Sequence, residues 1–339
     1  MTARADPSAW RGPELAGDPS WICPLTGAEI ADLDAALRGF QALGLPLANM
    51  TRELFPLPVL APTLARHLAE IERGRGFVVV RGLPMDRYTD DEVGWIFYGI
   101  GTHLGLPLHQ NPRGDLLGHV FDQGRAYGQI DVRGYETNAH LPFHTDGCEL
   151  VGLLCLRAAR SGGLSSLVSA TAIHAEIART RPECLEPLYR GYHYIRREAA
   201  LTESPVTPQR VPVFGVKDGV VSCRIVPNQI KAGAKKRGVP LAPLEQQALD
   251  LVVELSYSAA FRLDMDLIPG DMQLCNNYTV LHSRTEFEDW PEPARRRHML
   301  RLWLGAREPR PLAPGFARQL GYSGKLYMEI ALQDAPGAL

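Results

Sequence analysis

The sequence has little net charge of either sign. Its 36 lysines and arginines nearly balance 38 aspartates and glutamates, which leaves a formal net charge of −2 over 339 residues. Proteins that bind nucleic acids usually carry a clear positive excess, so this balance argues against a nucleic-acid partner. The sequence also lacks the roughly 18–20 consecutive apolar residues that a membrane-spanning helix needs. We therefore expect neither a nucleic acid nor a membrane among the partners.

Cysteine is scarce, and its spacing carries no motif. Six cysteines are spread over the chain without a C-x-x-C pair, so neither a disulfide framework nor a zinc ribbon is indicated. The first residues lack the apolar segment of a secretory signal and are interrupted by proline and glycine. These absences together predict a cytoplasmic protein with reduced thiols.

Glycine and proline are abundant instead, at 32 and 27 residues. That composition suits many short strands joined by turns. Apolar runs predict strands at 76–84, 117–122, 149–157, 191–197, 211–225, 266–282 and 296–304, and helical periodicity predicts helices at 28–43, 62–73, 90–104, 170–190 and 243–258. Strands and helices do not alternate regularly, which disfavours a doubly wound parallel sheet. The pattern fits an α+β fold with a mainly β core, a double-stranded β-helix (jelly roll) that carries N-terminal and inserted helices.

We expect a single folded domain. Residues 1–22 look like a flexible N-terminal arm, and residues 23–339 contain no internal repeat and no low-complexity linker. Residues 90–135 are expected to cover the functional site, because long loops with glycine and polar residues often carry binding functions.

The segment FHTDG at 143–147 contains the first candidate metal ligands. If this segment is a strand, His144 and Asp146 project from the same face, since residues two apart in a strand do so. One imidazole and one carboxylate make two thirds of a facial triad for iron(II). An H-x-D pair also arises by chance, and a surface histidine beside a turn aspartate is the simpler explanation of this pair alone.

A second histidine comes from a distant part of the chain. Pro269-Gly270-Asp271 predicts a tight turn, and a largely apolar strand follows it with His282 near its far end. A third ligand from a remote strand is what a metal site inside a barrel requires. Taken alone, His282 is better explained as a hydrogen-bonded, partly buried histidine.

The segment RRRHMLRLWLG at 295–305 predicts a strand with arginines at its buried end. Arg297 and Arg301 are four residues apart and therefore share one strand face. A buried guanidinium is costly unless it meets an anion, which it can bind through two parallel hydrogen bonds. A structural salt bridge is the alternative. Upstream, the glycine pair in SGGLSS turns the chain and brings a hydroxyl, that of Ser165, which could donate to a carboxylate.

The order of these elements is more specific than any one of them. An H-x-D pair, a G-G-x-S segment, a distant histidine in N-N-x-x-x-L-H-x-R and then R-x-x-x-R resemble the taurine dioxygenase-like (TauD/TfdA) family of iron(II)/2-oxoglutarate-dependent oxygenases. The resemblance runs from about residue 70 to 315 and includes GFVVVRGLP and the closing RLWL.

The resemblance implies a cofactor set and a role for each residue. His144, Asp146 and His282 match the iron ligands, and the cosubstrates are 2-oxoglutarate and dioxygen. Arg297 matches the arginine that pairs with the distal carboxylate of 2-oxoglutarate, and Ser165 stands where the family has a hydroxyl helping it. The presence of Asp146 argues against halogenation, because related halogenases lack this carboxylate.

The second arginine, Arg301, matches a residue that grips an acidic group of the substrate in some relatives, and the two arginine roles could be exchanged or shared. Other candidates for the substrate pocket are Gln110, Arg133, Tyr135, Asn138 and Arg284. Taurine is not the expected substrate, because the other residues that bind taurine in this family are not evident in the sequence. An amino acid or another carboxylate-bearing metabolite of secondary metabolism, hydroxylated, desaturated or cyclised, suits these residues better.

Two other functions stay open at this point. A zinc-dependent hydrolase could use the same three ligands, since zinc also accepts histidine and aspartate, but it would not need Arg297. A non-catalytic β-helix binding module would be favoured if the three ligands failed to converge. The expected partner is a small molecule, with homo-oligomers possible.

Overall fold

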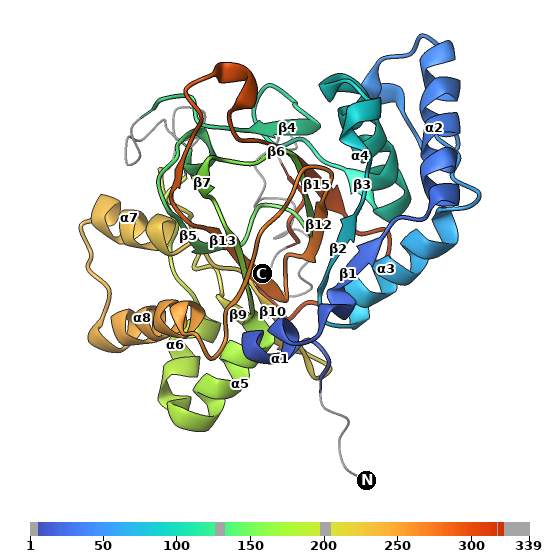
Figure 1. Cartoon of the computed structure of the whole chain (residues 1–339). Helices are drawn as coiled ribbons and strands as arrows, with labels where there is room; N and C mark the ends of the chain where they lie inside the picture. Colours follow the sequence, from blue (N-terminus) through green and yellow to red (C-terminus); the bar gives the residue numbers. More distant parts are fainter. Residues whose placement is uncertain (1–5, 126–132, 197–204, 317, 322–339) are drawn as a thin grey trace.

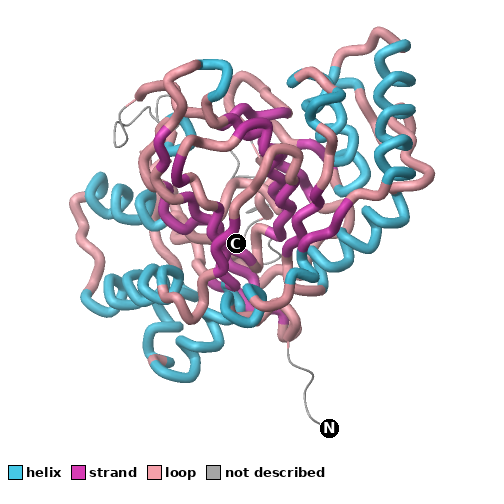
Figure 2. The backbone as a smooth tube through the Cα atoms, viewed as in Figure 1, coloured by secondary structure: helices cyan, strands magenta, loops and turns pink. Residues whose placement is uncertain are grey.

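The computed structural model describes residues 6–125, 133–196, 205–316 and 318–321. Two β-sheets lie at the centre, with helices on both flanks (Figures 1 and 2). The major sheet has the order β1-β2-β12-β6-β15-β3, and β4 also pairs with β15; the minor sheet has the order β11-β8-β13-β5. Together with the structural relatives described below, this arrangement confirms the double-stranded β-helix predicted from the sequence.

The strands are short, as the frequent turns predict. Those of the major sheet are β1 (Ile22–Pro24), β2 (Phe77–Arg81), β3 (Leu106–Pro107), β4 (Leu117–Val120), β6 (Leu150–Arg157), β12 (Met272–Asn276) and β15 (His298–Gly305). Those of the minor sheet are β5 (Leu141–His144), β8 (Ser165–Ser169), β11 (Leu263–Met265) and β13 (Val280–Arg284). Two small two-stranded sheets are formed by β7 (Ser161–Gly162) with β14 (Phe287–Glu288) and by β9 (Phe214–Lys217) with β10 (Val220–Cys223).

The helices form two layers outside the sheets. They are α1 (Gly12–Ala16), α2 (Gly27–Ala42), α3 (Ala61–Arg73), α4 (Asp90–Leu104), α5 (Ala170–Thr180), α6 (Leu185–Arg190), α7 (Pro227–Arg237) and α8 (Pro243–Tyr257). Apolar side chains of α2, α3 and α4 pack with those of β6, β12 and β15, while α5, α6 and α8 pack on the minor sheet. A third apolar cluster that includes Phe77, Leu167 and Trp303 draws on strands of both sheets.

Local signals explain where several elements begin. Helix α4 starts with the capping box expected from its sequence, in which the Thr89 hydroxyl accepts from the Glu92 backbone and the Glu92 carboxylate accepts from the Thr89 backbone. Strand β2 is buried at four consecutive residues, as its continuous apolar run predicts. No helix among the described residues is long and apolar enough to cross a bilayer.

The N-terminal segment corrects one expectation. From residue 6 on, the segment expected to be a flexible arm is folded onto the domain. Trp10 and Trp21 are 5% and 8% exposed and pack against Phe77, with ring centroids 5.3 and 6.0 Å away. Prolines and glycines suggested disorder there, but two buried indoles remove enough apolar surface from water to fix the chain.

The segment 266–282 corrects a second expectation. It is not one strand but two, β12 and β13, which belong to different sheets. Asn276 and Tyr278 turn the chain between them, with the Asn276 side chain accepting from the Tyr278 backbone. A continuous apolar run hides this turn, because the residues on both sides of it are buried in the same interior.

Three smaller differences concern other segments. The expected strand 211–225 is the hairpin β9–β10, and the described part of 191–197 forms only isolated bridges at Tyr192 and Ile195. Helix α7 was not predicted, although it has proline in its first turn and Gly238 at its end. Helix α4 packs on the major sheet and so does not cover the site; residues 126–132 of the expected covering loop lie outside the described residues.

Candidate active site

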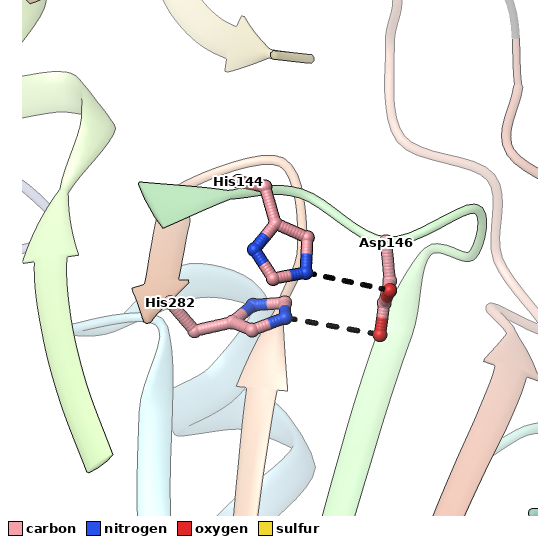
Figure 3. A group of neighbouring side chains, drawn as sticks. All are labelled: His144, Asp146 and His282. Atoms are coloured by element: carbon pink, nitrogen blue, oxygen red, sulfur yellow. Dashed lines mark ion pairs between the residues drawn. The ribbon is translucent and has the colours of Figure 1, made fainter. Parts of the chain in front are cut away.

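His144, Asp146 and His282 come together between the sheets (Figure 3). The Nε2 atoms of His144 and His282 lie 3.8 and 3.7 Å from the Asp146 carboxylate, and the two imidazole centroids are 4.4 Å apart. One ligand atom from each residue lies within 4.8 Å of the others. The three candidate ligands therefore converge, which argues against the non-catalytic binding module.

Strand pairing brings the two histidines together. His144 is the last residue of β5, and His282 stands directly opposite it on the antiparallel β13. Asp146 comes after the end of β5, so it does not share a strand face with His144 as the sequence suggested. It reaches the histidines because the chain turns, and a turn residue needs other groups to hold it.

Asn277 holds that turn, and sequence reasoning assigned it no role. Its side-chain oxygen accepts from the Asp146 backbone at 3.0 Å, and its amide donates to the carbonyls of Asp146 and Cys148 at 2.6 and 2.7 Å. Asn277 is fully buried. The doubled asparagine that precedes His282 was the available signal.

The protonation states at this site suit a metal ion. The His144 Nδ1–H donates to the carbonyl of Pro142 at 2.8 Å, so Nε2, which faces Asp146, is the ring nitrogen that can bind a metal. Burial raises the pKa of Asp146, but the positive charge of Arg301, the histidines and a hydrogen bond from Trp303 outweigh it and bring this pKa to about 2. Burial lowers the pKa of His282 to about 3. Neutral imidazoles and an ionised carboxylate are the forms that bind metal.

Arg301 lies beside the three candidate ligands and is held on several sides. Its Nη1 is 3.5 Å from Asp146 Oδ2, and its Nε donates to Gln110 at 2.9 Å. The guanidinium carbon lies 4.8 Å from the ring centroids of both Tyr135 and Trp303. Gln110 also donates to the Arg301 carbonyl, so its observed role is to orient this arginine.

Arg297 is buried with unused hydrogen-bonding capacity. Its side chain is 7% exposed, and its Nη1 has no hydrogen-bond partner among the described residues. A Cβ at Gly163 would lie 3.1 Å from Arg297 Nε, so this glycine makes room for the side chain. Burial lowers the pKa of Arg297, which measures the cost of an uncompensated buried charge. An anion seated on Nη1 would relieve that cost.

Ser165 lies at the start of β8 and already has a partner. Its hydroxyl donates to the side-chain oxygen of Gln273 on β12 at 2.6 Å, and both residues are buried. Because β8 and β12 belong to different sheets, this bond crosses the interior. Gln273 was not predicted, since a glutamine within an apolar run looks like an ordinary strand residue.

The remaining candidates for the substrate pocket divide. Tyr135 reaches the site through its contact with Arg301. Arg284 donates to the backbone carbonyls of Thr137 and Ala139 and so helps to hold that loop. Asn138 is exposed, and its carbonyl accepts from a backbone N–H. Arg133 is half-buried at the start of the short helix 134–136, where its backbone donates to Glu136.

Comparison with known proteins identifies this arrangement. Residues 44–303 match the model of the family "Taurine catabolism dioxygenase TauD, TfdA family". The chain belongs to this family. The TauD/TfdA chain is 30% identical to FR-33289 synthase of Streptomyces rubellomurinus over 310 residues, covering 89% of this chain and 90% of that protein. It is 32% identical to the taurine hydroxylase-like protein SAT17 of Stachybotrys chartarum, covering 88% and 78%.

The solved structures agree on the fold of the TauD/TfdA chain. Asparagine oxygenase in complex with Fe(II), 3-hydroxyasparagine and succinate superposes with a TM-score of 0.67 at 17% identity, covering 84% of this chain and 93% of that one. Membership of this family makes the protein an iron(II)/2-oxoglutarate-dependent dioxygenase that uses dioxygen. A zinc hydrolase would not need the buried Arg297, and membership of the TauD/TfdA family excludes the zinc hydrolase.

Proposed function

We propose that this dioxygenase hydroxylates, desaturates or cyclises an anionic small molecule, such as an amino acid or another carboxylate-bearing metabolite. The reaction is coupled to oxidative decarboxylation of 2-oxoglutarate to succinate. The observation that carries this proposal is a pair of buried arginines at the start of β15, with Arg301 inside the strand beside Asp146 and Arg297 directly before the strand. Two buried guanidiniums are costly unless anions meet them.

We assign the iron to His144, Asp146 and His282, and the far carboxylate of 2-oxoglutarate to Arg297. The unpartnered Nη1 of Arg297 supports this assignment, because a bidentate carboxylate is the group that fits it. Ser165 can join if its hydroxyl turns away from Gln273. When bound, iron with 2-oxoglutarate and dioxygen supplies the oxidant that removes a hydrogen atom from the substrate. The protein's own part is to position both molecules and exclude water.

We assign the anionic group of the substrate to Arg301. The aromatic rings of Tyr135 and Trp303 and the amide of Gln110 fix this guanidinium close to the metal ligands. A pre-positioned guanidinium orients a substrate at little entropic cost, which is how binding energy places a reacting C–H bond. Its interaction with Asp146 leaves other N–H groups of the fork for the substrate.

Cofactor binding is the first test. Wild-type protein reconstituted anaerobically with iron(II) and 2-oxoglutarate should develop the visible metal-to-ligand charge-transfer band. In Arg297→Ala the 2-oxoglutarate concentration needed for half of the band should rise about 100-fold, because truncating one partner of a buried charge pair costs about 2–5 kcal/mol. Absence of the band in wild type would refute the proposal.

The substrate class is tested by succinate release over a panel of amino acids, other carboxylates and neutral analogues. Matched variants at the two arginines separate their roles. Arg297→Ala should raise KM for 2-oxoglutarate with any substrate, and Arg301→Ala should raise KM for the anionic substrate. Exchange of these two effects would show that the arginine roles are reversed, and activity on neutral compounds alone would exclude an anionic substrate.

We place this reaction in the cytoplasm, in a pathway of secondary metabolism, without nucleic-acid or membrane partners. All six cysteines are free, and five of them are buried, which suits a reducing compartment. A related protein is named a synthase, in keeping with a biosynthetic intermediate as substrate. Homo-oligomers are compatible with this proposal.

A further inference from the structure

The carboxylate of Asp146 is held by different groups from those that hold its backbone. Asn277 binds only backbone atoms of the Asp146 turn. The side chain instead receives the indole N–H of Trp303, which donates to Oδ2 at 3.0 Å, and it faces Arg301 Nη1 at 3.5 Å from the same oxygen. The other oxygen, Oδ1, accepts no hydrogen bond from any described residue.

Trp303 suits this task better than Arg301. The ring is 6% exposed and packs in the cluster between the sheets, so its N–H direction is fixed by packing. An indole has a single donor and no acceptor, and here that donor is aimed at the carboxylate. Arg301 Nη1 lies 3.5 Å from Oδ2, whereas the Trp303 nitrogen lies 3.0 Å from it. The Arg301 guanidinium also donates to Gln110 and contacts two aromatic rings.

We propose that Trp303 is a positioning residue for the metal centre, which occupies Oδ2 of Asp146 and so reserves Oδ1 for the metal. A carboxylate that binds through one oxygen leaves open positions on the metal for cosubstrates, as a facial triad requires. Partners that orient a ligand typically affect metal affinity 10–100-fold. The inference rests on the metal centre assigned under the proposed function and adds the residue that sets the ligand's orientation.

The test compares Trp303→Phe with Trp21→Phe. Phenylalanine keeps an aromatic ring against Arg301 but removes the N–H donor together with part of the ring volume, a loss that the Trp21→Phe control shares. Trp21 is a matched control, because it is also a buried tryptophan, 8% exposed, whose N–H donates to a carbonyl, that of Leu15 at 3.0 Å. The measurement is the dissociation constant for Mn(II), followed by the electron paramagnetic resonance of the free ion.

Trp303→Phe should bind Mn(II) about 10-fold more weakly than wild type, whereas Trp21→Phe should match wild type. With saturating metal, the 2-oxoglutarate affinity of Trp303→Phe should stay within about two-fold of wild type, because Arg297 is untouched. An Mn(II) constant within two-fold of wild type, or an equal loss in both variants, would overturn the proposal. Wild type that binds Mn(II) but not 2-oxoglutarate would refute the proposed function and leave this comparison valid.

A second measurement needs no change at Trp303. The chain has five tryptophans, so five indole N–H resonances are expected in a ¹⁵N–¹H spectrum. Asp146→Ala should move the resonance of Trp303 and leave that of Trp21 in place. An unchanged set of five resonances would contradict the hydrogen bond even if Trp303→Phe failed to fold.

Discussion

At the scale of single residues, the two arginines of the site differ in how much of their hydrogen-bonding capacity the protein uses. Arg301 has Gln110 and Asp146 as partners, whereas Arg297 Nη1 has none among the described residues. Such an orphan is unusual, because buried polar groups are nearly always paired. We interpret the difference as an anion site kept open at Arg297.

Gly163 tests this interpretation without touching the arginine. Gly163→Ala places a methyl group 3.1 Å from Arg297 Nε on a backbone with φ +73°. Gly44→Ala is the control, since Gly44 has φ +65° and open space around it. Both should lose about 1–2 kcal/mol of stability from the left-handed backbone, but only Gly163→Ala should weaken 2-oxoglutarate binding in a titration of the visible band. Equal 2-oxoglutarate affinities would separate Gly163 from the anion site.

Asn277 carries the next prediction at this scale. Asn277→Ala removes three hydrogen bonds from buried backbone groups around Asp146, which should cost about 2–4 kcal/mol of unfolding free energy. Denaturant unfolding of the metal-free protein measures it, with the exposed Asn49→Ala as control. A loss as small as that of the control would mean that the turn holds itself.

At the scale of secondary-structure elements, the sequence predicted the site better than its scaffold. His144, Asp146 and His282 were found because the order of the H-x-D pair, the distant histidine and the R-x-x-x-R pair resembles a known family. Their geometry was not, since a strand was assumed to continue through Asp146 and a single strand to run through 266–282. Asn277 was missed although the doubled asparagine before His282 marked it, and Trp303 was missed because a tryptophan in an apolar strand indicates only core packing.

The first residue of β15, His298, makes a pH-dependent contribution to stability. His298 Nε2 lies 2.9 Å from His119 Nδ1, and Arg157, itself paired with Asp90, donates to His298 Nδ1 at 3.0 Å. His298 is therefore neutral, with its proton on Nε2, and burial, reinforced by the charge of Arg157, lowers its pKa to about 4. The folded-state pKa of His298 lies below its usual value of 6.5. Neutral His298 therefore contributes its full stabilisation above pH 6.5, and this stabilisation is lost as the pH falls towards 4.

Melting temperatures between pH 7.5 and 4.5 measure this effect. Wild type should lose stability towards the acid end more steeply than His298→Gln, because glutamine does not titrate. His174→Gln should flatten the curve in the same direction, because His174 is a partly buried histidine on α5 whose pKa burial also lowers. Parallel curves for wild type and His298→Gln would show that His298 does not titrate as described.

At the scale of the whole molecule, distant parts of the chain converge on the turn that holds Asp146. Thr145 bonds Ile225, Asn277 bonds the turn itself, and the Gly321 N–H donates to the Gly147 carbonyl at 2.8 Å. These contacts join residues about 80 to 170 positions apart in the chain. The metal centre is consequently a product of the complete fold, and metal binding should stabilise that fold.

Glu149 lies two residues after Gly147 in the chain, and its ion pair with Arg318 can be tested alone. Arg318 donates to both Glu149 oxygens, at 3.0 and 2.7 Å, and Glu149 is almost fully buried. Arg318→Met should cost about 1–3 kcal/mol of unfolding free energy, less than a fully buried pair, because the arginine side chain is 38% exposed. Glu149→Gln and the double variant complete a cycle, in which a coupling free energy near zero would show that the pair contributes only packing.

If the C-terminal residues fix the turn, Arg318→Met should also weaken Mn(II) binding, whereas Arg160→Met, which breaks an exposed pair with Glu288, should not.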